Sequence, residues 1–259
     1  MDEEMSFKSL TITIAVSVFV IYTVLILSLF YFFSGSLFIE TLFSERTLFS
    51  LRLSVLTATL ATIVSLVFAI PSSYALSRYD FFGKRLIDTL LELPLIVSPV
   101  ALGAMLLIFF NTPAGEMIQE RSTQIVFTIY GILLAQFITT VGVAIRLMKA
   151  VLDEIPKKYE EMAWILGRSH WNTFFTVVLP LSKKGILSSA VLTWAKALGE
   201  FGATITIAGS MAMKTETLPV AIFMRLAGAD IQGTVTLVLI LIGIGLGILF
   251  GVRLLTDKA

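Results

Sequence analysis

Apolar residues dominate this chain in six long runs separated by shorter polar segments. Each run is continuous rather than alternating, and each reaches the roughly 20 residues that a helix needs to cross a bilayer. We therefore expect an all-α integral membrane protein with one transmembrane domain over residues 1–259 and a core at 50–252. The six predicted spans are residues 11–33, 52–76, 90–110, 125–147, 185–208 and 233–252.

Composition supports a membrane protein and excludes several functions. Of the 259 residues, 57% are hydrophobic and only 14% are charged, against about 45–50% and roughly 25% in soluble domains. The chain has no cysteine, and His170 is its only histidine. Thiolate catalysis and a multi-histidine metal site are therefore excluded, and we expect neither catalytic residues nor a metal. The net charge of +1 argues against nucleic-acid binding.

The N-terminus differs from a cleavable signal peptide. Asp2, Glu3 and Glu4 stand where a signal peptide carries basic residues, and the first apolar run is longer than a signal peptide needs. We expect this run to remain as a membrane span.

Lysine and arginine are divided unevenly between the predicted loops. If the N-terminus lies in the cytoplasm, the inner segments hold 13 of the 19 basic residues and the outer loops hold 5, while Lys196 lies at membrane depth. Cytoplasmic loops of membrane proteins are enriched in basic residues. This bias predicts a multi-pass protein of the plasma membrane with both termini in the cytoplasm.

The longest inner segment, residues 150–184, is charged and does not span. Pro156 suits the start of a helix, and residues 157–166 are good helix formers. Gly167 is expected to end this helix, at a positive φ or at a close backbone approach. The helix carries an apolar stripe formed by Tyr159, Met162, Ala163, Ile165 and Leu166.

Two further signals follow that helix. Ser169 can cap a second short helix through Trp171 and Phe175, and Pro180 is expected to break the chain before the fifth span. An amphipathic helix of this kind can lie on the membrane surface or dock a soluble partner. The fixed glycine and the Leu-Pro pair favour docking, because a lever joined rigidly to the next span needs them.

The segment resembles the EAA motif of ABC importer permeases. Glu161, Ala163 and Gly167 match the first part of the motif, and Leu179 and Pro180 match the second, while Met162 stands where the family usually has alanine. In that family the segment is a coupling helix that sits in a cleft of the ATPase subunit. The resemblance implies ATPase coupling for Glu161, Met162, Ala163, Ile165, Leu166, Gly167, Leu179 and Pro180.

The resemblance covers about residues 50–252. Residues 195–204 are most similar to the molybdate/tungstate/sulfate oxyanion branch, and closest to molybdate permeases; residues 215–219 fit the same branch. It implies a type I ABC importer permease fold with a cytoplasmic coupling helix. It also implies four partners: two copies of an ATPase, an extracytoplasmic oxyanion-binding protein, a second permease copy in a homodimer, and membrane lipid. A heterodimer stays open.

The chain lacks the phosphate-binding motif G-x-x-x-x-G-K-[ST]. We therefore expect a transport subunit that is not itself an enzyme and holds no cofactor, with ATP and Mg²⁺ bound by the partner ATPase.

Lys196 and Glu200 fall inside the predicted fifth span. Charges at membrane depth usually face a bundle interior or water, and residues four apart share one helix face. The two residues therefore either pair structurally or line the translocation path or its gate. Four hydroxyls could also meet a passing oxyanion, although each could instead bond its own helix. They belong to Thr57, Thr62, Thr204 and Thr206.

Three other functions stay open at this point. One is a sulfate/thiosulfate ABC permease. Another is an ion-coupled secondary carrier, whose charged relay would consist only of Lys196 and Glu200. The third is a membrane-embedded enzyme, which would need a cluster of polar catalytic residues that the sequence does not offer.

Overall fold

The computed structural model describes residues 2–121 and 123–257, and every regular element within these ranges is a helix. Five helices among the described residues are long and apolar enough to cross a membrane. The expected all-α membrane architecture is therefore confirmed. The five are α1 (Asp2–Leu29) with the 3-10 turn Phe30–Phe32, α3 (Glu45–Arg78), α8 (Ile129–Asp153), the stretch His170–Leu198, and α14 (Ile231–Asp257).

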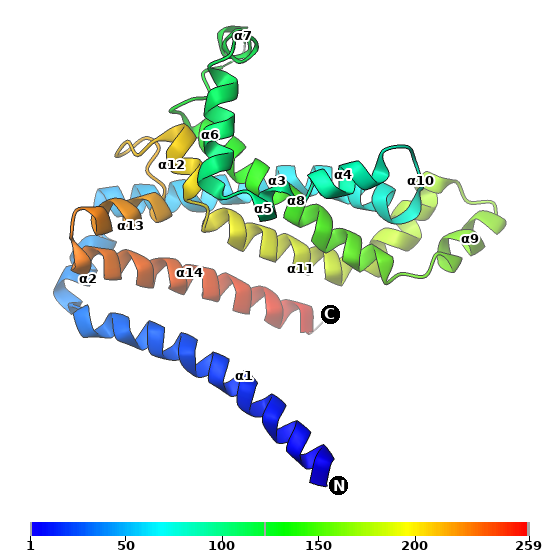
Figure 1. The fold of residues 1–259 in the computed structure, drawn as a ribbon, viewed down its shortest axis with the longest axis horizontal. Helices are drawn as coiled ribbons and strands as arrows, with labels where there is room; N and C mark the ends of the chain where they lie inside the picture. Colours follow the sequence, from blue (N-terminus) through cyan, green and yellow to red (C-terminus); the bar gives the residue numbers. More distant parts are fainter. Residues whose placement is uncertain (1, 122, 258–259) are drawn as a thin grey trace.

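The long helices lie roughly side by side (Figure 1). α3 packs along α8, and the stretch that ends at Leu198 packs against both of them. α1 lies apart at the edge, with its apolar residues exposed. Both termini lie toward the end of the bundle that carries α9 (Lys158–Ile165).

The third predicted span consists of two helical parts and is not one straight helix. The chain bends by 112° between two helical parts, and the second part leaves the bundle steeply (Figure 1). Pro99 lacks an N–H and holds Ser98 in an extended conformation, so the helix cannot continue. The bent pair brings the number of spans to six if it counts as one. Its parts are α4 (Lys84–Leu90) with α5 (Leu93–Ile96), and α6 (Pro99–Phe110).

The fifth span begins earlier than predicted, and Pro180 does not break it. α10 (His170–Thr173) runs through a π-helical turn (Phe174–Val178) into α11 (Leu179–Leu198). In that turn the N–H of Leu179 donates to the carbonyl of Phe174, five residues back. The wider turn accommodates the missing N–H of Pro180, so the helix continues.

The same span is interrupted where none was predicted. α11 ends at Leu198, residues 199–201 are not helical, and α12 (Gly202–Ala208) follows. α12 packs closely on α6, so the two helix breaks meet. Three shorter helices complete the loops: α2 (Gly35–Leu42), α7 (Pro113–Arg121) and α13 (Leu218–Ala227).

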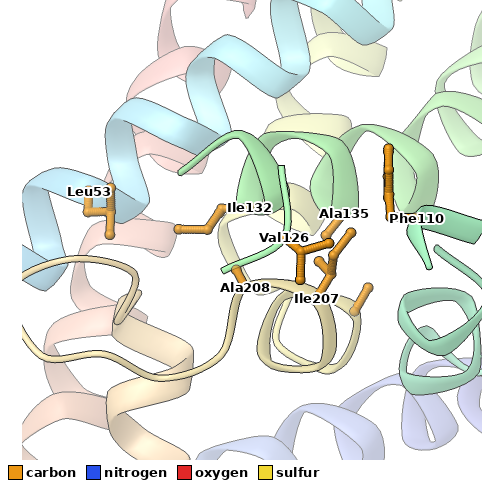
Figure 2. Packing of buried hydrophobic residues seen from close by; sticks show 8 residues of the cluster. Leu53, Phe110, Val126, Ile132, Ala135, Ile207 and Ala208 are labelled. Carbon is orange, nitrogen blue, oxygen red and sulfur yellow. The ribbon is translucent and has the colours of Figure 1, made fainter. Parts of the chain in front are cut away.

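A compact apolar cluster holds α3, α6, α8 and α12 together (Figure 2). Gly103 of α6 allows the close contact with α12. A Cβ at this position would lie 2.8 Å from both the Cα and the carbonyl oxygen of Ala203. The cluster consists of Leu53, Phe110, Val126, Ile132, Ala135, Ala203, Ile207 and Ala208.

We predict that Gly103→Ala destabilises the protein by about 1–3 kcal/mol, the usual cost of overpacking. The matched control is Gly247→Ala in α14, where a Cβ meets nothing within 4 Å. Because alanine favours a helix over glycine by about 0.5–1 kcal/mol, the control should unfold at the same temperature or higher. Thermal unfolding in detergent measures both variants. Equal midpoints for the two would contradict the close contact between α6 and α12.

Candidate functional site

The first candidate site is α9 and the turn that follows it. Gly167 adopts a φ of +83°, and a Cβ there would meet nothing within 4 Å, so the backbone angle alone explains the glycine. Its N–H donates to the carbonyl of Trp164, and the N–H of Arg168 donates to that of Ala163. This pattern closes the helix end. The hydroxyl of Ser169 accepts from the N–H of Asn172 and caps the next helix. Both predicted signals are confirmed.

α9 presents an apolar surface on one side. Ile165 and Leu166 are 84% and 80% exposed, and Met162 is exposed beside them. Ala163 is only 6% exposed and faces the protein. The prediction that Ala163 shares the docking stripe is therefore wrong, because its side chain is buried. We call the exposed set Met162, Ile165 and Leu166 the outer face of α9.

The inner face of α9 is fixed by a buried carboxylate. Glu160 Oε1 accepts a hydrogen bond from Arg78 Nε at 2.6 Å, and Glu160 Oε2 accepts one from the Tyr74 hydroxyl at 2.5 Å. The side chains of Arg78 and Glu160 are 6% and 2% exposed. Arg78 also donates to the carbonyl of Ile155 at 3.0 Å. This network joins the end of α3 to α9.

Sequence reasoning missed Glu160. Its neighbour Glu161 matched a motif, whereas Glu160 was one of several polar positions. Its partners Tyr74 and Arg78 lie 86 and 82 residues away in sequence, so no local pattern reveals the contact.

α9 is also tied to the fifth span. The rings of Trp164 and His170 are 4.5 Å apart. Tyr74 of α3, which donates to Glu160, packs edge-on against Phe174 at 5.1 Å. Leu179 and Pro180, the other predicted coupling residues, begin α11 directly after this contact. The structure therefore links Glu161–Gly167, through the π-helical turn, to the span that ends at Leu198.

The second candidate site is the break in the fifth span. Glu200 lies in the break, and its Oε1 accepts from the N–H of Ala203 at 2.9 Å, so it caps α12. Within the described ranges, Lys196 forms no ion pair. The predicted helical pairing of Lys196 with Glu200 is wrong, because the helix ends between them. Gln136 of α8 donates to the carbonyl of Ala197 at 3.1 Å, and the same carbonyl accepts from the N–H of Glu200 at 3.1 Å.

Both charged residues border one cavity, which is widely open at the surface of the chain. Its volume is about 470 Å³, and its lining includes Lys196, Glu200 and Pro99, the first residue of α6. The cavity therefore lies where the two helix breaks meet.

The four candidate threonines do not line this cavity. Thr62 and Thr206 donate to carbonyls of their own helices at 2.7 Å, and Thr57 does so at 3.4 Å. Thr204 is fully buried and its hydroxyl has no partner in the described part of the chain. The hydroxyls of Thr57, Thr62 and Thr206 therefore bond their own helices, whereas that of Thr204 does not.

Comparison with known proteins adds the family context. Residues 61–258 match the family model described as "Binding-protein-dependent transport system inner membrane component". The chain is 36% identical over 188 residues to the molybdenum transport system permease protein ModB of Haemophilus influenzae, which covers 71% of this chain and 82% of ModB. It is 30% identical over 221 residues to the sulfate transport system permease protein CysT of Escherichia coli, covering 85% and 80%.

Solved structures share the fold at low sequence identity. A chain of a bacterial alginate ABC transporter, in complex with an alginate pentasaccharide-bound periplasmic protein, gives a TM-score of 0.72 at 15% identity. The match covers 95% of this chain and 91% of that one.

We predict that Glu160→Ala costs about 3–5 kcal/mol of stability, because it leaves the Arg78 charge buried without a partner. Glu161→Ala is the matched control. Its side chain is exposed one position along the same helix, so the change should stay within about 0.5 kcal/mol. Unfolding midpoints in detergent compare the two, and similar losses for both would refute the structural role of Glu160.

Proposed function

Because the chain belongs to the family of binding-protein-dependent transport system inner membrane components, we propose that it imports molybdate or tungstate at the expense of ATP hydrolysis by a partner. The membership itself makes the chain a permease subunit of an ABC importer, in the oxyanion branch. It is a multi-pass transport component without an ATPase site of its own.

The type I ABC importer permease fold is confirmed by the family match and by the structural likeness. We also propose how this subunit assembles with its partners. Two copies of the permease enclose the path, and two ATPase subunits, which hold ATP and Mg²⁺, bind on the cytoplasmic side. An extracytoplasmic binding protein delivers the oxyanion. The structure of the alginate transporter with its periplasmic protein supports the last partner by analogy.

α9 is the proposed docking element for the ATPase. The observation that carries this proposal is the combination of an exposed apolar face with a rigid inner face. Met162, Ile165 and Leu166 would enter the ATPase surface, while Glu160 holds the helix to α3. Glu161, Ala163 and Gly167 shape the helix and its end. A movement of the ATPase would then shift α9 and α3 together, because no flexible loop separates the two contacts.

The orientation proposed is N-in and C-in. Both termini lie toward the end of the bundle that carries α9 (Figure 1), so a cytoplasmic α9 places them in the cytoplasm as well.

The cargo proposed is a tetrahedral oxyanion of the molybdate type. The 36% identity to the molybdenum permease of H. influenzae supports molybdate or tungstate. The 30% identity to CysT of E. coli supports sulfate as the second candidate. Lys196 and Glu200 are proposed to border the path at the break in the fifth span. Thr57, Thr62 and Thr206, whose hydroxyls bond their own helices, are proposed to stabilise the helices beside it.

We predict that Ile165→Asp abolishes co-purification of the ATPase, because it places a charge in an apolar contact. Since Ile165 is exposed, the unfolding midpoint of the permease should not change. Met213→Asp, the same kind of change at an exposed residue of the loop before α13, should leave the ATPase bound. Retention of the ATPase by Ile165→Asp would refute docking through the outer face of α9.

Reconstituted uptake tests the cargo. Vesicles containing the permease and its ATPase, supplied with the binding protein, should accumulate labelled molybdate when ATP is present. Excess tungstate should block the uptake, whereas excess sulfate should not. Uptake of sulfate instead would assign the chain to sulfate import.

A further inference from the structure

The cavity at the break in the fifth span combines features that suit an anion. Lys196 is the only lysine or arginine among residues 185–208, the run predicted as the fifth span. It lies in the last turn of α11 and is partly buried. In the described structure its ammonium group has neither an ion pair nor a hydrogen bond. A cation held at membrane depth without a partner is costly, which points to a partner that arrives from outside the chain.

The neighbouring carboxylate does not fill that role. Glu200 directs Oε1 to the N–H of Ala203 at 2.9 Å, because the start of α12 needs an acceptor for its free N–H groups. The Glu200 carboxylate is therefore held by a backbone hydrogen bond, while Lys196 borders the same cavity without an ion pair.

The cavity is large enough for a hydrated ion. Its volume is about 470 Å³, while one water molecule occupies roughly 30 Å³ in the liquid. A tetrahedral oxyanion could therefore enter with part of its hydration shell. The first turn of α6 also borders the cavity at Pro99 and Val100, and the positive end of that helix adds to the attraction.

We propose that Lys196 binds the oxyanion transiently in this cavity during transport, and that Glu200 keeps this binding weak. This inference rests on the proposed import of an oxyanion. Passage through a membrane requires a site that attracts the ion and also releases it. One ammonium group provides the attraction, and one fixed carboxylate on the same cavity limits it.

The test is uptake of labelled molybdate, with tungstate and sulfate as alternative cargoes, by the assembled transporter in vesicles. Lys196→Met should reduce uptake of the transported anion at least tenfold, and Lys196→Arg should restore most of it. ATP hydrolysis stimulated by the loaded binding protein should persist in Lys196→Met, because α9 and its contacts are intact. Lys184→Met, a change of an exposed lysine on the same helix, is the matched control and should transport normally.

A second variant separates charge from structure. Glu200→Gln keeps an oxygen that can accept from Ala203 but removes the negative charge. It should lower the anion concentration that half-saturates uptake and also lower the maximal rate, because the anion leaves more slowly.

Two results would overturn the inference. The first is uptake by the Lys196→Met variant that equals uptake by the wild type. The other is a loss shared by Lys196→Met and Lys196→Arg together with a lower unfolding midpoint, which would mark Lys196 as structural. If the wild-type assembly moves none of the three oxyanions, the proposed function itself fails, and this assignment fails with it.

Discussion

The need to satisfy every backbone polar group inside a bilayer constrains this structure most. Lipid offers no hydrogen bonds, so an interrupted helix is tolerated only where protein or enclosed water supplies partners. The chain interrupts two spans, before Pro99 and after Leu198, and brings both interruptions to the same place. Glu200 accepts from the N–H of Ala203 at the start of α12, and Gln136 donates to the carbonyl of Ala197 at the end of α11. The cavity beside Lys196 follows from this arrangement, because irregular backbone cannot fill space as closely as two packed helices.

A different interaction holds α9, the proposed docking helix, to the end of α3. Glu160, Arg78 and Tyr74 form a buried network whose charged members lie on separate elements, α9 and α3. A buried ion pair adds little stability over well-packed apolar residues, but it tolerates the loss of neither partner. Such a contact fixes orientation more than it adds to the stability of the fold. For the proposed docking of α9, fixed orientation is the useful property, because α9 can move α3 only if the joint between the two helices does not bend.

The sequence predicted the parts of this molecule that depend on local chemistry. Five apolar runs became helices, Gly167 took a positive φ, and Ser169 capped the next helix. The features that were predicted wrongly or missed depend on contacts between residues that are far apart in the sequence. The break after Leu198 depends on capping by Glu200 and on packing against α6, and the apolar composition of residues 185–208 conceals it. Pro180 was expected to end a helix, but a wider turn before it avoids the clash. The role of Glu160 required knowledge of Arg78, which lies 82 residues away.

The π-helical turn Phe174–Val178 lies between Gly167 and Pro180. In this segment the number of residues matters as much as which residues they are. Each residue of an α-helix turns it by about 100°. Deleting one residue between Gly167 and Pro180 would therefore rotate the whole of α11 relative to α9 by more than a quarter-turn, although every remaining side chain would be unchanged. Lys196 would then face a different neighbour, far from the deletion. The number of residues between Gly167 and Pro180 therefore determines how α11 is rotated relative to α9, and with it how the proposed path is oriented relative to the proposed docking helix.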